Sequence, residues 1–315
     1  MSQQHNCCVY LGEELAAYGF GHDHPFCPKR HQVFEQAFYK QSLHEKVDVL
    51  APQTIEQNVL ELFHSHDYVE QVKQQSRLGT GFLDQGDTPA FVGMFEAASF
   101  VTGSVCNAVD RIINNEYQRA FIPIAGLHHA RRHIAAGFCV FNDCGIAIEY
   151  LRHQHNIQRI SYIDIDAHHG DGVFYSFEED PELIFADLHE DGRFLYPGTG
   201  AENEAGKGLA KGTKLNIPMS PGSNDEAFMQ AWESVEVFLL KYPTDFILLQ
   251  AGADSIKGDP ITHMEYTEKA HAYTVKRLRI LADKMCKGRI IVMGGGGYNH
   301  DNIAKTWTAV VESMA

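Results

Sequence analysis

The sequence has few of the features that mark secreted or membrane proteins. Its seven cysteines are an odd number at irregular spacing and include no C-x-x-C pair, so neither a disulfide framework nor a structural zinc knuckle is expected. The first 15 residues contain no basic segment followed by an apolar one, which argues against a secretory signal. No apolar run reaches the roughly 18 residues of a membrane helix. We therefore expect a cytoplasmic protein that does not bind membranes.

Positive charge is also scarce. The chain has 26 Lys and Arg residues against 41 Asp and Glu residues, a net charge of −15. Non-specific nucleic-acid binding needs a basic surface, so nucleic acid is not an expected partner. Internal repeats, low-complexity tracts and Pro/Ser-rich linkers are absent too. With 315 residues, of which 44% are hydrophobic, the chain is predicted to form one globular domain over residues 1–315.

What the sequence does contain is a series of short apolar runs separated by helical patterns. The apolar runs predict strands that are covered on both faces, at 120–126, 159–165, 183–188, 214–219, 245–252 and 289–295. Helical periodicity predicts helices at 95–113, 143–156, 225–242 and 266–285. Such alternation of strands and helices is typical of α/β proteins. The predicted fold is therefore α/β, with a mostly parallel open sheet and helices on both faces.

Polar side chains follow four of the predicted strands, at the point where each strand ends. They are His128 and His129, then Asp164, Asp166, His168 and Asp171, then Asp254, and finally Tyr298. In open parallel sheets, ligands bind outside the carboxyl ends of the strands. Because four distant segments place polar residues at this edge, we expect one functional site there.

The pattern Asp166-Ala-His168 predicts part of a metal site. In an extended segment, residues two positions apart point to the same side, so the carboxylate and the imidazole can reach one ion. Asp254 follows another apolar strand and is a candidate third ligand. Two carboxylates and one imidazole would leave a coordination position open on zinc, as catalytic zinc sites do.

The adjacent histidines His128 and His129 are candidates for acid–base catalysis. A carboxylate that holds an imidazole fixes its tautomer and raises its basicity, which suits a general base. Asp164 and Asp171 are the candidate partners.

Other patterns carry weaker signals. The run GGGGYN at 294–299 lacks the G-x-x-x-x-G-K-[ST] pattern of a phosphate loop, and AENEAGKG at 201–208 has Gly208 where that motif needs Ser or Thr. Four glycines suit a backbone that passes close to a ligand, with Tyr298 at its end. The remaining histidines are expected at the surface or in local hydrogen bonds, and the pair His22 and His24 is expected in a loop without metal. These residues are His5, His22, His24, His31, His44, His64, His66, His153, His155, His271 and His300.

Five motifs, in this order, resemble those of the zinc-dependent histone deacetylase superfamily. They are LHHARRHIAAGFCVFND (127–143), YIDIDAHHGDGV (162–173), YPGTG (196–200), LQAGADS (249–255) and GGGGYN (294–299). The likeness extends from about residue 18 to 312, and DTPAFVGMFEAAS (87–99) is most similar to the bacterial acetoin-utilisation branch, a relative of the acetylpolyamine amidohydrolases. The resemblance implies the arginase–deacetylase fold and a hydrolase that removes acetyl groups from N-acetylated alkyl amines.

The resemblance also implies roles for individual residues. Asp166, His168 and Asp254 would bind one zinc ion. His128 and His129 would be the catalytic pair, backed by Asp164 and Asp171, with Tyr298 as the oxyanion donor. The substrate would contact Asp87 at the rim, Gly137, Phe138 and Tyr196 along an acyl tunnel, and Ile261 at a gatekeeping position, with Arg30 near the tunnel floor. A structural potassium ion would bind through Asp164, Asp166 and His168 and the backbone of Asp187 and Leu188.

Three positions differ from many relatives and bear on the substrate. Tyr196 replaces Phe, Asp187 replaces Ser, and Ile261 stands where the eukaryotic polyamine-specific relative has Glu. The last difference and Asp87 favour acetyl-lysine. The acidic net charge favours a cationic amine, so acetylated polyamines such as acetylputrescine and acetylcadaverine stay open as an alternative.

Two other functional classes fit less well. An arginase-like dimetal ureohydrolase would need a D-x-H-x-D motif, but residue 170 is glycine and Asp254 has no acidic partner in its motif. A catalytically silent acyl-binding protein would not need two histidines, their aspartates and Tyr298.

Overall fold

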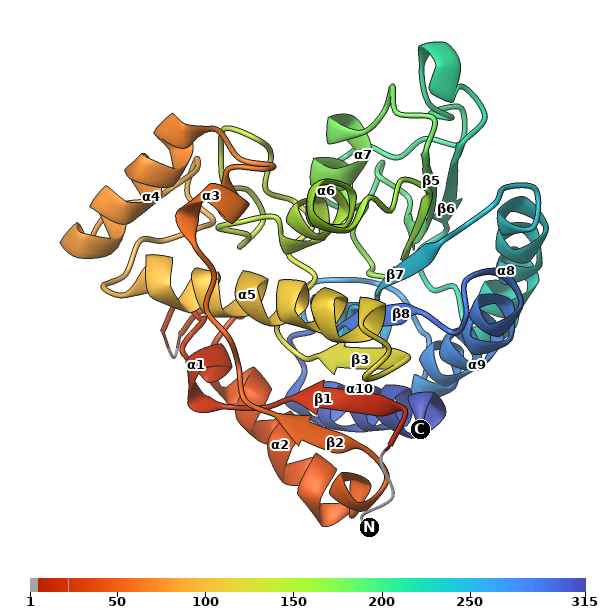
Figure 1. Ribbon diagram of the computed structural model, residues 1–315, viewed down its shortest axis with the longest axis horizontal. Coiled ribbons are helices and arrows are strands. Elements are labelled where there is room, and N and C mark those ends of the chain that lie inside the picture. The colour runs from red at the N-terminus through yellow and green to blue at the C-terminus, as the bar shows by residue number, and fades with distance from the viewer. Residues whose placement is uncertain (1–4, 22) are drawn as a thin grey trace.

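One eight-stranded sheet forms the centre of the molecule (Figure 1). The computed structural model describes residues 5–21 and 23–315. The strands are β1 (Cys7–Tyr10), β2 (Asp48–Leu50), β3 (Arg119–Ile122), β4 (Ile160–Asp164), β5 (Leu183–Glu190), β6 (Lys214–Met219), β7 (Phe246–Gln250) and β8 (Ile290–Met293). Their order is β2-β1-β3-β8-β7-β4-β5-β6, and each neighbouring pair is parallel. The predicted α/β class with a parallel open sheet is confirmed.

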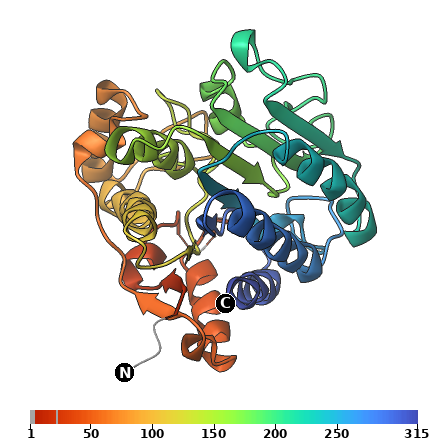
Figure 2. The ribbon, with the colours of Figure 1, turned by 45° about the vertical axis from the view of Figure 1, so that its right-hand side comes forward.

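Helices cover both faces of the sheet (Figures 1 and 2). They are α1 (Glu13–Ala16), α2 (Lys29–Lys40), α3 (Gln57–Leu60), α4 (His66–Leu78), α5 (Met94–Ile113), α6 (Asp143–His155), α7 (Asp171–Ser176), α8 (Asp225–Leu239), α9 (Glu268–Met285) and α10 (His300–Met314). On one face α5 packs against α4 and α6; on the other, α10 packs against α2 and α9, and α8 lies beside α9. Among the described residues, no helix is both long and apolar enough to cross a bilayer.

All six predicted strands belong to the sheet, but β1, β2 and the helices α1, α2, α3, α4, α7 and α10 were not predicted. Strand β2 has only three residues, and α2 buries just four side chains of a largely polar segment, so their apolar patterns are weak. The predicted strand 120–126 ends at Ile122. Pro123 follows and has no N–H group to donate to the ladder.

The register of the central strands places their last residues at one level. Asp164 at the end of β4 lies opposite Gln250 of β7 on one side and Asp187 of β5 on the other. Gln250 in turn lies opposite Met293, the last residue of β8. Segments that follow these strands therefore leave the sheet side by side, and they form the site.

Candidate active site

The site lies at the carboxyl ends of four adjacent strands, β3, β8, β7 and β4. His128 and His129 lie in the segment after β3, and Tyr298 lies in the segment after β8. Asp254 lies in the short 3₁₀ turn Ala253–Ser255 after β7. Asp164 ends β4, Asp166 and His168 follow it, and Asp171 begins α7. The structure thus brings together the four segments whose polar ends the sequence marks.

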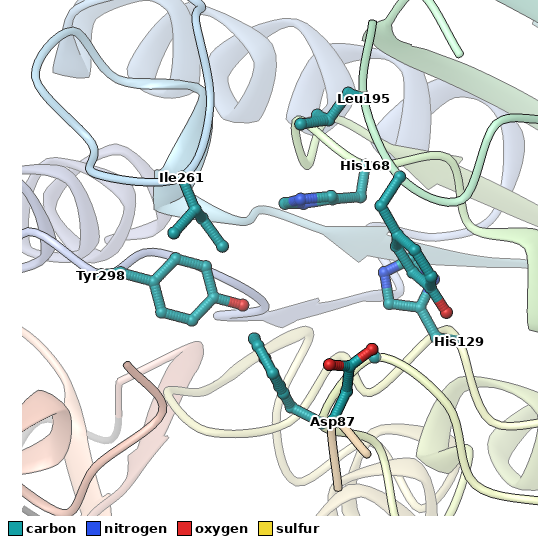
Figure 3. Close-up of a pocket in the computed structure, with 9 residues that line it drawn as sticks. Asp87, His129, His168, Leu195, Ile261 and Tyr298 are labelled. Atoms are coloured by element: carbon teal, nitrogen blue, oxygen red, sulfur yellow. The ribbon is translucent and has the colours of Figure 1, made fainter. Parts of the chain in front are cut away.

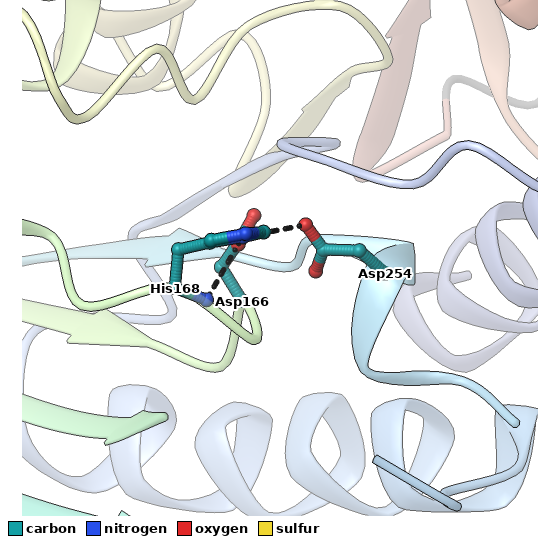
Figure 4. Close-up of side chains that lie close together, drawn as sticks. All are labelled: Asp166, His168 and Asp254. Carbon is teal, nitrogen blue, oxygen red and sulfur yellow. Dashed lines mark hydrogen bonds and ion pairs between the residues drawn. The ribbon is translucent and has the colours of Figure 1, made fainter. Parts of the chain in front are cut away.

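Asp166, His168 and Asp254 form a compact cluster that could hold a metal ion (Figure 4). All three are buried, and one potential ligand atom from each lies within 4.8 Å of the others. The Nδ1 atom of His168 lies 3.1 Å from Oδ1 of Asp166 and 3.1 Å from Oδ2 of Asp254. No other group of three or more possible ligands occurs in the ranges 5–21 and 23–315.

The remaining carboxylate oxygens of this cluster are held by the protein. Oδ2 of Asp166 accepts hydrogen bonds from Nε2 of Gln250 (2.7 Å) and from the backbone N–H of Gly296 (2.9 Å). Oδ1 of Asp254 accepts from the N–H of Ala167 (2.9 Å). Each carboxylate therefore has one oxygen held by these hydrogen bonds and directs the other towards His168. Carboxylates that bind metal ions are typically held by further hydrogen bonds in this way.

The charges of the cluster fit a bound cation. Burial and the nearby carboxylate of Asp166 raise the pKa of Asp254 to about 7. Burial opposes a charge on His168, but the two carboxylates raise the pKa of its imidazole to about 10. Two carboxylates that are buried together need a compensating positive charge, and one imidazole with two carboxylate oxygens is a ligand set that zinc accepts. The residues present therefore fit zinc.

Glycines make room for these carboxylates. A Cβ atom on Gly296 would lie 2.1 Å from Oδ2 of Asp254, and one on Gly252 would lie 2.0 Å from Oδ2 of Asp166. No other residue fits at either position without displacing a potential ligand. The glycine run before Tyr298 therefore allows the close approach that its composition suggested.

The two histidines form separate pairs with carboxylates and also contact each other. Nδ1 of His128 lies 2.8 Å from Oδ2 of Asp164, and Nδ1 of His129 lies 2.7 Å from Oδ1 of Asp171. Their Nε2 atoms are 3.1 Å apart, so a single proton between these two atoms makes the hydrogen bond. All four side chains are buried.

This environment separates the pKa values of the two imidazoles. Burial opposes protonation of His128, but the charge of Asp164 raises its pKa to about 9. For His129, burial and the positive charge of His128 lower the pKa to about 4, despite the bond to Asp171. At neutral pH, His128 therefore keeps its proton and His129 is neutral, which leaves His129 able to accept one.

A cavity of about 220 Å³ opens from the surface to these groups (Figure 3). Its lining residues are Asp87, His129, Gly137, Phe138, His168, Leu195, Tyr196, Ile261 and Tyr298. They include all five residues predicted to contact the substrate, together with Leu195, which was not predicted. The walls are mostly apolar and the inner end carries His129, His168 and the hydroxyl of Tyr298 (Figure 3), so the cavity suits an apolar chain that ends in a polar reacting group.

Tyr298 is a protonated hydrogen-bond donor at this inner end. Burial and the carboxylate of Asp254 raise the pKa of the phenol well above its usual value. The ring packs edge-on against Phe138, with centroids 5.8 Å apart. Its backbone N–H donates to Oδ2 of Asp259 (2.8 Å), and the other oxygen of Asp259 accepts from the N–H of Ile261 (3.1 Å). Asp259 therefore joins the segment of Tyr298 to the wall of the cavity.

Comparisons with known proteins agree with this site. The family model described as the histone deacetylase domain matches residues 24–314. The chain belongs to the histone deacetylase family. It is 35% identical over 293 residues to the acetoin utilization protein AcuC of Bacillus subtilis, covering 90% of this chain and 75% of that protein. The AcuC protein of Staphylococcus aureus (strain MRSA252) is 31% identical over 324 residues, covering 99% and 83%.

A solved structure also matches this deacetylase. The crystal structure of the HDA15 HD domain superimposes with a TM-score of 0.91 at 25% sequence identity, covering 99% of this chain and 88% of that chain. The resemblance inferred from the five motifs is confirmed, and the chain is a deacetylase of the hydrolase class.

Several residues of the deacetylase site were missed by the sequence analysis. Gln250 binds Asp166, and Asp259 binds the backbone of Tyr298. Arg131 donates from Nη2 to Oδ2 of Asp171 (2.9 Å), which leaves Oδ1 for His129. A polar residue at the end of the apolar run FILLQ was a signal for Gln250. No local pattern identified Asp259 or Arg131, because their partners lie about 40 residues away in the chain.

The position of Arg30 also follows from the fold. Arg30 extends from α2, is fully buried, and donates from Nε and Nη2 to the carbonyl oxygens of Gly297 and Gly295. Its guanidinium lies 5.5 Å from the ring centroid of Tyr298. Arg30 therefore holds the glycine run that leads to Tyr298.

The expectation that the other histidines lie at the surface or in local hydrogen bonds was wrong for His31, His64 and His271, which are buried, and for His155, which bonds Asp110 from 45 residues away. His64 accepts a hydrogen bond from the backbone N–H of Asn142, 78 residues away. His271 donates from Nε2 to the carbonyl of Gly252. Only the tertiary packing decides whether such a histidine is covered. His24 lies in a loop, with its ring 4.6 Å from that of Phe138. Its neighbour His22 lies outside the described residues.

Proposed function

We propose that the protein is a zinc-dependent amidohydrolase that removes acetyl groups from acetyl-lysine side chains. The observation that carries this proposal is that His129, His168 and Tyr298 line the inner end of one apolar-walled cavity. A general base, a candidate metal ligand and an oxyanion donor are the groups that amide hydrolysis needs at the carbonyl carbon.

In the proposed reaction, Asp166, His168 and Asp254 would bind zinc, which would act as a Lewis acid towards the amide carbonyl and the attacking water. His129 takes the proton of that water and later transfers a proton to the leaving amine. Asp171 holds the imidazole of His129 in position, and the positive charge of His128 disfavours a proton on His129, which leaves His129 unprotonated and able to accept one. Tyr298 donates its hydroxyl proton in a hydrogen bond to the oxygen on which negative charge develops.

We propose one zinc ion per chain rather than two. A dimetal site of the arginase type would need a carboxylate at residue 170, where a Cβ atom would lie 2.7 Å from Oδ2 of Asp164. The backbone at Gly170 therefore has no room for the additional ligand. Metal analysis with one turnover assay on an acetyl-lysine substrate separates this proposal from a dimetal hydrolase and from a silent acyl-binding protein.

The preference for acetyl-lysine is supported by the outer part of the cavity. Asp87 lies at the rim and can accept hydrogen bonds from peptide N–H groups, and Ile261 provides no carboxylate for the ammonium of a polyamine. The alternative substrate, an acetylated diamine, is supported by the acidic net charge of −15. Direct competition between an acetyl-lysine peptide and acetylputrescine or acetylcadaverine tests the choice, and we expect the higher kcat/KM for the peptide.

We also propose a potassium ion beside the metal site, held through Asp164, Asp166 and His168 and the backbone of Asp187 and Leu188. The carboxylate of Asp187 lies 2.7 Å from Nδ1 of His189 and accepts from the N–H of Gly170 (2.9 Å). Because this carboxylate already has two partners, we expect backbone oxygens to provide ligands at residues 187 and 188. Replacing potassium by sodium in the assay should lower activity.

Two further proposals concern the whole chain. Residues 1–315 form one catalytic domain, since a single sheet runs from β1 to β8. The enzyme acts in the cytoplasm, a compartment in which thiols stay reduced; its seven cysteines are free and buried.

A further inference from the structure

The rim residue Asp87 lies at the tip of a small hairpin between α4 and α5. Phe82 and Pro89 form an antiparallel bridge, and the N–H of Leu83 donates to the carbonyl of Thr88 (2.9 Å). At the tip, Oδ1 of Asp84 accepts hydrogen bonds from the N–H groups of residues 86 (3.0 Å), 87 (2.9 Å) and 88 (2.9 Å). The backbone that presents Asp87 is therefore held by one carboxylate.

Thr88 connects this tip to the wall of the cavity. It is fully buried, and its hydroxyl donates to Oδ2 of Asp84 (2.6 Å). Burial opposes the charge on Asp84, but these hydrogen bonds hold the pKa of its carboxyl below the usual value. An ionised carboxylate only accepts hydrogen bonds, so the hydrogen of Thr88 points to Asp84. A lone pair on the Thr88 oxygen is thereby directed at the N–H of Phe138, 3.2 Å away.

Phe138 needs such a partner because its backbone is in an unfavourable conformation. Gly137 and Phe138 are consecutive residues with positive φ, 53° and 70°, a region that side chains other than glycine rarely occupy. The carbonyl of Phe138 accepts from the hydroxyl of Tyr18 (2.7 Å). Its N–H donates to Thr88, and its ring lines the cavity beside Tyr298. Two side chains from distant segments thus hold the backbone that sets this wall.

We infer that Thr88 is a positioning residue that couples the rim at Asp87 to the wall at Phe138. The inference rests on the proposed function, since it concerns the substrate of that cavity. One hydrogen-bonded unit positions Asp87, which contacts the peptide or diamine that bears the acetylated amine outside the cavity. The same unit positions Phe138, which limits the space around the acyl group inside the cavity. Selectivity between a peptide and a diamine substrate and selectivity for the length of the acyl group should therefore change together when the Thr88 hydroxyl is removed.

The test compares Thr88→Val, which has the same shape without the hydroxyl, with Thr88→Ser, which keeps the hydroxyl. We expect amide hydrogen exchange at Phe138 to become about tenfold faster in Thr88→Val, as for the loss of one ordinary hydrogen bond, and to stay unchanged in Thr88→Ser. The kcat/KM ratios of acetyl-lysine over acetylcadaverine and of acetyl-lysine over butyryl-lysine should both fall several-fold in Thr88→Val alone, with metal content unchanged.

Three results would overturn the inference. The first is unchanged amide exchange at Phe138 in Thr88→Val, and the second is a Thr88→Ser variant that behaves like Thr88→Val. The third is an equal loss of kcat/KM on all substrates, which would keep both ratios and indicate a merely structural role. If Thr88→Val does not fold, Thr88→Ala serves instead, because it also lacks the hydroxyl and should give the same exchange and ratios. A parent enzyme inactive on all these substrates, but with the expected exchange pattern, would refute the proposed function and the selectivity effect and would still support the positioning of Phe138 by Thr88.

Discussion

The inner end and the rim of the cavity are built in different ways. At the inner end, Asp166, His168 and Asp254 follow directly from strands and are buried, and both carboxylates are anchored by further partners. At the rim, Asp87 is exposed at the tip of a hairpin, and Ile261 lies in a loop. The positions of the reacting groups depend on the sheet, while contacts to the substrate outside the cavity depend on loops. Changes at the inner end should therefore abolish turnover, and changes at the rim should shift selectivity.

The largest effect is expected from removal of a metal ligand. Asp254→Ala, Asp166→Ala and His168→Ala should each lose the metal, and activity should fall about a thousandfold or more, because a bound metal supplies several kcal/mol of transition-state stabilisation. Elemental analysis should find one equivalent of zinc in the parent and none in these variants. The rim variant Asp87→Asn is the control and should keep its zinc. Two equivalents in the parent, or zinc that persists in all three variants, would contradict the assignment.

Tyr298→Phe should have the next largest effect. Loss of one oxyanion donor typically lowers kcat by about 10²–10³, and the effect should be on kcat because only the transition state carries the developing charge. Zinc content and KM should stay close to those of the parent. A raised KM with an unchanged kcat would make Tyr298 a binding residue instead.

His64 should make the stability of the folded protein depend on pH. Its Nε2 accepts from the N–H of Asn142, whose side chain donates to the backbone carbonyls of Ala130 (2.8 Å) and His128. Burial lowers the pKa of His64 from 6.5 to about 3, although the backbone of Arg132 and Arg131 favours the protonated form. Because the pKa of His64 is depressed in the folded state, neutral His64 contributes to the free energy of unfolding above pH 6.5, and this contribution is lost as the pH falls from 6.5 towards 3.

At pH 5 the loss from His64 should be about 2 kcal/mol, or about 30-fold in the folding equilibrium. His64→Gln keeps an oxygen that can accept the same N–H but does not titrate. Urea unfolding of zinc-loaded protein at pH 7.5 and pH 5.0 should therefore show a smaller decrease for the variant than for the parent. Equal decreases would show that His64 does not contribute.

The smallest effect is expected at the rim. Asp87→Asn or Asp87→Ala should lower kcat/KM for acetyl-lysine peptides about tenfold, because charge-assisted hydrogen bonds to peptide N–H groups are lost. Acetylputrescine and acetylcadaverine offer no such groups and should be affected less by Asp87→Asn. The reverse order, with diamines affected most, would show that the rim recognises amines and would favour the polyamine alternative.

Much of the fold and of the inner end could be predicted because the signals are local. Near-continuous apolar runs such as β4 and β7 identify strands that are covered on both faces. The pattern Asp-Ala-His directly after β4 placed a carboxylate and an imidazole on one side of the chain. Short or polar elements such as β2 and α2 have weaker patterns and were missed.

The α/β class, the family and the segments that carry reacting groups could thus be assigned from the sequence alone, since each depends on the order and spacing of nearby residues. The groups that support these segments could be identified only from contacts in the folded chain. Asp259 holds the backbone of Tyr298 from 39 residues away, and Thr88 meets Phe138 from 50 residues away. A hydrogen bond acts over about 3 Å, so its partners are known only once the chain has brought distant segments together.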